Sequence, residues 1–366
     1  MTTLLIFLPF LVVFGLAAVY AERKISAYIQ DRMGPMEVGP RGLLQTVADI
    51  LKLLQKEDIT PQGADKWLFT LAPILIFTVI FAGFAVIPLA PELVGSAAYV
   101  GVFYLLAIIS LDVIGLLMAG WASASKFPII GAMRAVAQIV SYEIPAGLAI
   151  LSVVMICQTL DLQEISYQQG IWATYTAPGS RQYLFGLPAL GIDITGVGGF
   201  LAWNIVRMPL LSVAFLIYFI AALAECNRAP FDIPEAESEL IGGYHTEYSG
   251  LKFAFFFLSE YGMMILLCLL MSVLFLGGWN TPLPNIGPVA LANWTSGTPG
   301  TWFGYLSGAF WMLSKALVLF FVQMWVRWVY PRLRVDQLMY LCWKVLVPFA
   351  LAIVLACGVW RLWMVG

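Results

Sequence analysis

The sequence contains little charge and few side chains that bind metals. Only 11% of its 366 residues are charged and 61% are hydrophobic, a balance that excludes an ordinary water-soluble domain. The only histidine is His245, so a haem held by two histidines, or a zinc site of histidines and thiolates, would lack ligands. We therefore expect no bound metal and no covalently attached cofactor.

Three further motifs are missing. The five cysteines form no C-x-x-C pair, so an iron–sulfur cluster would also lack its ligands. Neither a G-x-G-x-x-G motif nor a Walker sequence occurs, which argues against a nucleotide site, and we expect no nucleic acid among the partners. Because no repeat or low-complexity tract divides the chain, we expect one integral membrane domain over residues 1–366.

Long apolar runs are abundant. Each is about long enough to cross a hydrocarbon core of roughly 30 Å, and none shows the period-2 alternation of a barrel strand. The runs lie near residues 4–21, 67–89, 98–120, 136–160, 202–224, 251–277, 302–329 and 341–363. The sequence therefore predicts an all-α polytopic membrane protein, a bundle of about eight transmembrane helices.

Lys and Arg residues predict the orientation, because cytoplasmic loops carry an excess of them. Most lie at one set of helix ends, in or within a few residues of the loops at about 22–66, 121–135, 225–250 and 330–340, and the exceptions are Arg181, Arg207, Lys315 and Arg361. We therefore expect these loops in the cytoplasm and both termini on the outer side.

The first of these loops contains an amphipathic helix. Its apolar residues recur at helical spacing between Arg41 and Lys56: Leu43, Leu44, Val47, Ile50, Leu51 and Leu54. Two interpretations remain open for it. It is either an anchor in the membrane interface or one wall of a cavity for an amphipathic ligand.

Carboxylates occur in the cytoplasmic half of several spans, where a charge is costly and usually functional. Glu143, Glu260 and Asp112 lie within spans, and Glu22 and Glu225 lie at span ends. A single such acid is more often a hydrogen-bonding group that locks a helix, but acids gathered at one depth suit proton exchange. The outer half has almost no acids, so a complete proton path is missing and we expect the chain to act with other subunits.

Ordered motifs from the first span to the last resemble one family. They include AERKISAYIQDRMGP (Ala21–Pro35), GPRGLLQ (Gly39–Gln45), SYEIP (Ser141–Pro145) and PRLRVDQ (Pro331–Gln337). The sequence resembles the H subunit of the bacterial NADH:quinone oxidoreductase, respiratory complex I, whose mitochondrial equivalent is called subunit 1.

This resemblance implies a subunit that forms the quinone-access tunnel and couples quinone reduction to proton translocation, without a complete active site of its own. It implies a proton-coupling chain of Glu22, Glu143, Glu225, Glu235, Glu237, Glu247 and Glu260. It places in the tunnel Arg23, Arg32, Asp49, Arg228, Phe231, Phe257 and Tyr261. Quinone, either ubiquinone or menaquinone, is then a substrate, and Arg134 and Asp232 would pair to hold the loops.

The resemblance also implies partners and a membrane. The partners are peripheral-arm subunits carrying the terminal iron–sulfur cluster, antiporter-like and small membrane-arm subunits, quinone and phospholipid. The bacterial plasma membrane is the preferred location and the mitochondrial inner membrane is the alternative. Residues that match no family motif are Asp112, His245 and those of the outer loop 161–200.

Two alternative functions remain. One is the equivalent subunit of a related membrane-bound hydrogenase or ferredoxin-linked complex, against which the dense match from Arg23 to Lys52 speaks. The other is an autonomous proton-coupled transporter, which the lack of a repeated half and of acids in the outer membrane half argues against.

Overall fold

A computed structural model describes residues 2–173, 183–186, 191, 193–234, 241–286 and 289–365. Its long helices are α1 (Thr2–Ile29), α3 (Lys66–Gly83), α4 (Gly101–Ala122), α5 (Lys126–Cys157), α9 (Pro209–Glu225), α11 (Gly250–Phe275), α13 (Trp302–Val329) and α15 (Val347–Val365). The short ones are α2 (Gln45–Gln55), α6 (Leu162–Tyr167), α8 (Asn204–Arg207), α12 (Leu291–Ser296) and α14 (Val335–Tyr340). Extended structure within these ranges is limited to isolated bridges, which confirms the all-α fold.

Six segments of the described chain are long and apolar enough to cross a membrane: Lys66–Val86, Gly101–Ala122, Lys126–Cys157, Gly250–Phe275, Trp302–Val329 and Val335–Trp363. The apolar helix α9 is shorter, and α1 carries charged residues near its C-terminal end. Together with α1 and α9, the six segments account for the apolar runs of the sequence.

Two helices begin at other residues than the apolar runs indicate. Helix α5 starts at Lys126, not near residue 136, so much of the loop expected at 121–135 is helical. Its Pro128 lies in the first turn, where a missing N–H costs no hydrogen bond. Helix α9 starts at Pro209, not near residue 202, and the short helix α8 precedes it.

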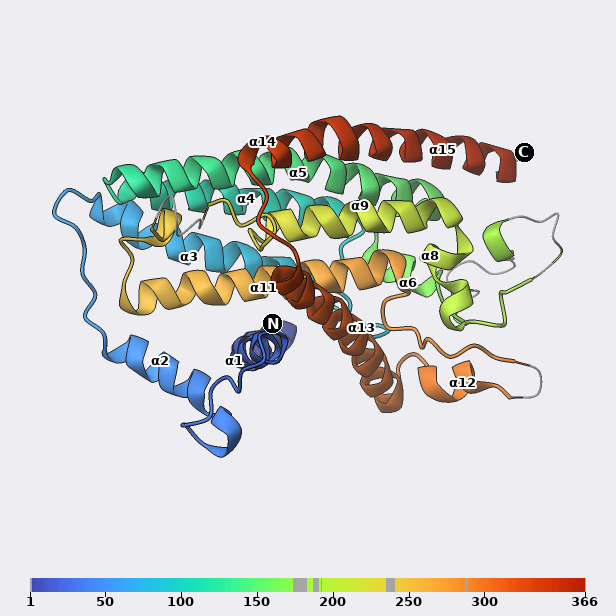
Figure 1. The fold of residues 1–366 in the computed structure, drawn as a ribbon. Coiled ribbons are helices and arrows are strands. Elements are labelled where there is room, and N and C mark those ends of the chain that lie inside the picture. Colours follow the sequence, from blue (N-terminus) through green and yellow to red (C-terminus); the bar gives the residue numbers. More distant parts are fainter. Residues whose placement is uncertain are drawn as a thin grey trace.

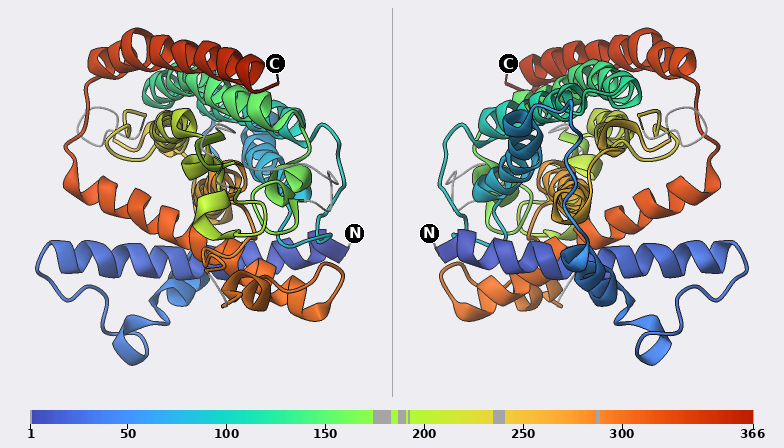
Figure 2. Two further views of the ribbon diagram at one scale, coloured as in Figure 1. Left: turned by 90° about the vertical axis from the view of Figure 1, so that its right-hand side faces the viewer. Right: turned by 90° about the vertical axis from the view of Figure 1, so that its left-hand side faces the viewer.

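Most long helices run side by side, and two cross them. In Figure 1, α3, α4, α5, α9, α11 and α15 lie roughly parallel, with α15 against α5 at one face. Helix α1 is seen end-on in Figure 1 and lengthwise in Figure 2, so it crosses the bundle steeply, and α13 runs diagonally. Helices α1, α2 and α13 thus lie on the face of the bundle opposite α15.

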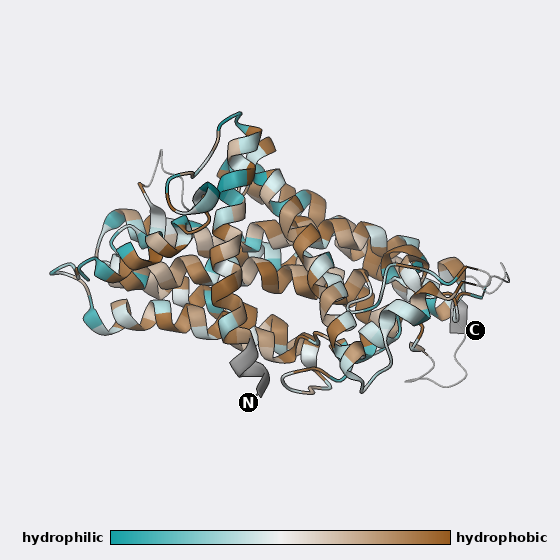
Figure 3. Ribbon diagram, turned by 90° about the horizontal axis from the view of Figure 1, so that it is seen from below, coloured by the Kyte–Doolittle hydropathy of each residue, from teal (hydrophilic) through white to brown (hydrophobic). Residues whose placement is uncertain are grey.

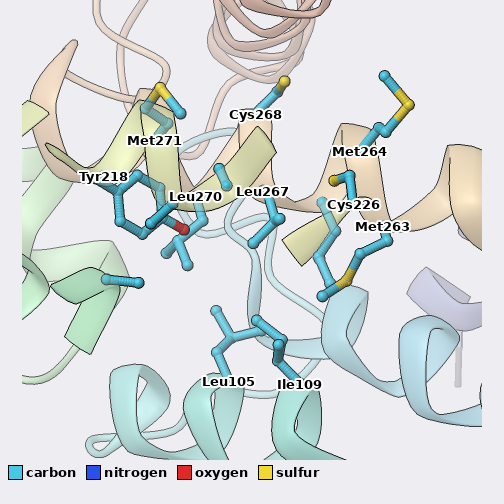
Figure 4. Close-up of a cluster of buried hydrophobic side chains, with 14 of the residues drawn as sticks. Leu105, Ile109, Tyr218, Cys226, Met263, Met264, Leu267, Cys268, Leu270 and Met271 are labelled. Carbon is cyan, nitrogen blue, oxygen red and sulfur yellow. The ribbon is translucent and has the colours of Figure 1, made fainter. Parts of the chain in front are cut away.

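Helix α11 is the centre of the core. Figure 4 shows its Met263, Met264, Leu267 and Cys268 among side chains from α4 and α9, including Leu105, Ile109 and Tyr218. Gly83 of α3 permits a close approach, because a Cβ there would lie 2.7 Å from the Leu266 side chain. Hydrophobic residues dominate the long helices in Figure 3, and hydrophilic residues gather at the loops.

A buried lysine stabilises the C-terminal end of α11. Lys315 of α13 donates hydrogen bonds from Nζ to the carbonyl oxygens of Leu276 (2.7 Å), Gly278 (2.8 Å) and Asn280 (2.5 Å). It also lies 4.3 Å from the centre of the Trp203 ring. These carbonyls belong to the turn that follows α11, so the ammonium group fixes that turn against α13.

Candidate functional site

Two arginines and two glutamates meet at the centre of the site. Arg228 follows α9 and is buried; its Nη1 lies 3.4 Å from Oε1 of Glu22 in α1, and its Nη2 lies 3.2 Å from Oε2 of Glu260 in α11. Arg327 of α13 also donates to Glu22. We call these four residues, together with Tyr261, the arginine–carboxylate cluster. It ties together α1, α11, α13 and the segment after α9.

Tyr261 completes the cluster. Its hydroxyl donates a hydrogen bond of 2.5 Å to Glu22 Oε2, and the Arg228 guanidinium lies 4.7 Å from the centre of its ring. Glu22 therefore receives donors from three different elements. Phe257, one turn earlier on α11, has its ring 6.1 Å from that of Tyr261 and is partly exposed.

A glutamine in α5 holds Arg228 in place. The Gln138 side-chain amide donates to the carbonyl oxygens of Ala224 and Phe231, each at 2.8 Å, and lies 3.2 Å from Asn227 Oδ1. These contacts fold the segment after α9 back onto α5, which directs Arg228 toward Glu22. Buried polar groups of this kind specify one loop conformation, because each alternative would leave one unpaired.

The segment after α9 is also tied to the chain that follows α13. Arg332 forms an ion pair of 2.9 Å with Asp232, and the backbone N–H of Leu333 donates to the carbonyl of Pro230 at 3.0 Å. The resemblance implies Arg134 as the partner of Asp232, and the structure adds Arg332 as a cation in direct contact with this carboxylate.

Two more carboxylates border a cavity between α4, α5 and α9 that opens at the surface of the bundle. Glu143 of α5 and Glu225 at the end of α9 line a space of about 370 Å³, together with Ser110 of α4 and Tyr218 of α9. Oε1 of Glu143 is buried and accepts no hydrogen bond from the described residues. The cavity therefore contains two acids that could exchange protons with water.

Asp112 of α4 links these acids to the arginine–carboxylate cluster. Asp112, Glu225 and Glu260 line a second cavity of about 20 Å³, room for about one water molecule. Asp112 is buried, and its Oδ1 accepts no hydrogen bond from the described part of the chain. The sequence places Asp112 among the acids at this depth, but no family motif contains it, so the resemblance does not include it among the expected site residues.

The expected tunnel residues fall into separate groups. Arg23 of α1 and Asp49 of α2 form an ion pair of 2.5 Å, which joins these two helices, and Arg228, Phe257 and Tyr261 lie together. Phe231 lies next to Arg228, with its backbone N–H donating to the Arg228 carbonyl oxygen at 2.8 Å, whereas Arg32 lies apart from both groups. Phe231 is buried with its ring 5.5 Å from that of Tyr142, and exposed Arg32 bonds to the nearby Gln30 at 2.7 Å.

Helix α2 is held through Asp49 and through the segment after its C-terminal end, while the apolar residues in it and just before it stay exposed. Beyond its C-terminal end, Lys252 of α11 pairs with Asp58 at 2.9 Å, and Ser249 accepts from the backbone N–H of Ile59 at 3.1 Å. Between a third and three-fifths of each apolar side chain is accessible for Leu43, Leu44, Val47, Ile50, Leu51 and Leu54.

Of the three remaining expected acids, the structure describes only Glu247. Glu235 and Glu237 lie outside the described residues. Glu247 is half-buried after the turn Gly243–His245 and forms no hydrogen bond or ion pair with another described residue. In the same turn, burial lowers the pKa of His245, although the charges of Glu260 and Asp232 oppose this, so its ring is mainly neutral at pH 7.

Comparison with known proteins identifies the family. A family model described as NADH dehydrogenase matches residues 1–358. The second NADH-quinone oxidoreductase H subunit of Cytophaga hutchinsonii is 58% identical over 364 residues, covering 100% of both chains. The H subunit of Chlorobium luteolum is 51% identical over 97% of this chain and 87% of its own length, and that of Anaeromyxobacter dehalogenans is 40% identical over 98% and 81%. The chain therefore belongs to the NADH dehydrogenase family, as the integral membrane H subunit of a multi-subunit NADH-quinone oxidoreductase.

Proposed function

We propose that this subunit forms the quinone-access tunnel and couples quinone reduction to proton translocation. The arginine–carboxylate cluster supports this most strongly, because Asp112 connects it through a water-sized cavity to Glu225 and from there to Glu143. These groups form a row of proton-binding sites inside an apolar bundle. Ionisable side chains are energetically costly there and usually have a function.

The proposed reaction end lies at Tyr261 and Arg228. Reduction of a quinone to a quinol takes up two electrons and two protons. The electrons would come from the iron–sulfur cluster of a peripheral-arm subunit, and this chain would hold the headgroup near donors such as Arg228 and Tyr261. A phenol that donates to Glu22 at 2.5 Å is placed to pass a proton between that carboxylate and a bound headgroup.

The proposed coupling is electrostatic. A change of charge at Glu22 or Glu260 alters the field at Asp112 across a cavity of about 20 Å³, and Asp112 in turn faces Glu225. Within a low-dielectric bundle such fields are weakly screened, so proton affinities along the row shift together. Antiporter-like and small membrane-arm subunits would receive the change beyond Glu143. Glu235, Glu237 and Glu247 would extend the row on the cytoplasmic side.

The proposed tunnel uses the exposed face of α2 and the aromatic face of α11. An isoprenoid tail needs apolar walls, which the exposed leucines of α2 and Phe257 supply. Arg23 and Asp49 would stand at the mouth, Phe231 would support the inner end, and Arg32 would guide quinone or bind a lipid phosphate. Ubiquinone or menaquinone is the substrate, and the protein would need no resident cofactor.

The proposed location is a bacterial plasma membrane, with both termini on the outer side. This orientation places the basic loops and the arginine–carboxylate cluster at the cytoplasmic end, where the peripheral arm would attach. Nothing in the described structure favours an autonomous transporter, and the relatives carry names of the quinone enzyme, not of a hydrogenase.

Glu225→Gln tests this proposal, because glutamine keeps the size of the side chain and removes its charge. In vesicles containing the intact complex, we expect loss of both NADH:quinone turnover and proton uptake, with NADH oxidation by an artificial acceptor retained. The control is Glu57→Gln, since Glu57 is exposed and its side chain bonds to no described residue. Normal turnover and pumping in an assembled Glu225→Gln complex would refute the role of the buried acids.

A further inference from the structure

Helix α15 lies at the edge of the bundle and exposes one face. Leu355, Val359 and Leu362 recur at helical spacing and are each more than two-thirds accessible, while Ile353 and Cys357 are buried toward α5. Of the six apolar spans, the one containing α15 is the least enclosed, with 22% of its apolar stretch buried. The exposed face of α15 therefore meets either lipid or another subunit.

A groove runs between this face and the start of α9. It has a volume of about 450 Å³ and is lined by Leu210, Leu355, Ala356, Val359, Trp360 and Trp363. The rings of Trp360 and Trp363 lie 6.2 Å apart near the C-terminal end of α15. Tryptophans at the end of a span are typical of the level at which lipid headgroups lie.

Two arginines stand at the same end of the groove. Arg361 of α15 follows Trp360, is half-buried, and forms no hydrogen bond or ion pair with any described residue; its Nε is buried. Arg207 precedes α9, is buried, and donates to the carbonyl of Gln168 at 3.2 Å. The two guanidinium groups lie close enough to repel each other electrostatically. Both also lie within electrostatic range of the buried thiol of Cys157.

The nearby acid does not neutralise them. The carboxylate of Glu164 lies within electrostatic range of the same Cys157 thiol. It accepts a hydrogen bond of 2.6 Å from the Thr159 hydroxyl and forms no ion pair with either arginine. Neither arginine has an ion pair within the described residues. Because an uncompensated cation in an apolar setting is costly, a partner of negative charge is expected from outside the chain.

We propose that this groove binds one anionic glycerophospholipid in the leaflet at the C-terminal end of α15. Arg361 contacts the phosphate, since guanidinium groups form paired hydrogen bonds with phosphate oxygens. Arg207 adds positive potential from behind, and one acyl chain lies along Leu210, Leu355 and Val359. The site is at the other end of the bundle from the arginine–carboxylate cluster and does not depend on the proposed quinone chemistry.

The test uses the intact complex and a photoactivatable phosphatidylglycerol with a diazirine on its acyl chain. After irradiation, peptides covering residues 347–363 are searched for the lipid label. We expect labelling on this segment that unlabelled phosphatidylglycerol competes away and phosphatidylcholine does not. Equal competition by both lipids would mean an ordinary annular lipid and would overturn the proposal.

Variants of the same segment sharpen the test. Arg361→Gln should reduce the labelling about fivefold, the loss expected for about one charge-assisted hydrogen bond. Arg361→Lys should retain more labelling, because it keeps the charge. The matched control is Lys344→Gln, which removes an exposed cation near the other end of the same span and should leave the labelling unchanged. Absence of label on wild-type α15, with a cross-link to another subunit there, would assign the groove to that subunit instead.

Discussion

The two ends of the bundle hold their buried charges in different ways. In the arginine–carboxylate cluster, Arg228 contacts two carboxylates, so charges of both signs meet. At the other end, Lys315 is held by three backbone carbonyls, and Arg361 has no partner within the described chain. Paired ionisable groups can transmit a change of charge, whereas a lysine on carbonyls only stabilises the fold. The comparison predicts loss of both assembly and activity when the cluster is broken, and loss of stability alone when Lys315 is replaced.

The largest effect is expected from Arg228→Gln. It leaves Glu22 and Glu260 buried with their donors reduced, and breaking a buried pair costs roughly 3–5 kcal/mol. We expect little assembled complex, and in what assembles a loss of quinone turnover of more than about tenfold. Assembly is measured by native gel and turnover in vesicles.

The control for Arg228→Gln is Arg332→Gln, because the Arg332–Asp232 pair is partly exposed and such pairs contribute about 0–1 kcal/mol. Equal effects of the two substitutions would show that burial of Arg228 is unimportant.

Lys315→Met should act on stability alone. Methionine fills a similar volume but leaves three carbonyl groups without a donor, for a cost of roughly 3 kcal/mol. We expect a lower Tm of the complex and unchanged turnover per assembled complex, measured by differential scanning fluorimetry and NADH:quinone assay. A turnover defect at normal Tm would instead place Lys315 on a proton path and end the contrast between the two ends.

Asp112→Asn tests the link between the cluster and the inner acids. Asparagine keeps the shape of the side chain but cannot take up a proton, so proton uptake should fall about tenfold, equivalent to about 1.4 kcal/mol. Proton uptake is followed with a pH-sensitive dye in vesicles, and NADH oxidation by an artificial acceptor serves as the control. Normal pumping in the Asp112→Asn complex would remove Asp112 from the row of acids.

The smallest effect is expected from Tyr261→Phe. The ring stays beside Arg228 while the hydrogen bond to Glu22 is lost, which is worth about 1 kcal/mol or about fivefold in turnover. Tyr99→Phe, at an exposed position, is the matched control. A Tyr261→Phe enzyme as active as the control would mean that the hydroxyl plays no part in the reaction.

Much of the fold could be predicted because a chain that spans lipid can adopt very few backbone structures. Long apolar runs must be helices when backbone groups cannot bond to water, and the long helices follow those runs. The start of α5 was predicted wrongly, because Lys126 and Arg134 lower hydropathy without interrupting the helix. The steep crossing of α1 could not be predicted, since tilt depends on packing against neighbours and not on length.

The sequence predicts the depth of the acidic residues in the membrane, but not which residues they contact. Glu22 and Glu260 were expected in the same half of the membrane, and the structure joins them through Arg228, which lies 206 residues from Glu22. No local pattern carries such a contact. The sequence places Asp112 among the acids at this depth, but its position between Glu225 and Glu260 depends on a cavity formed with α9 and α11.

The steep path of α1 gives it a mechanical property. Its 28 residues form a rod of about 42 Å, and near the C-terminal end Glu22 is pinned by donors from Arg228, Arg327 and Tyr261. Core side chains such as Phe7 and Phe14 pack the rest of the helix, so the donors to Glu22 fix its C-terminal part. Loss of the hydrogen bonds to Glu22 would allow the C-terminal part of α1 to move, and α2 would move with it through the Arg23–Asp49 ion pair.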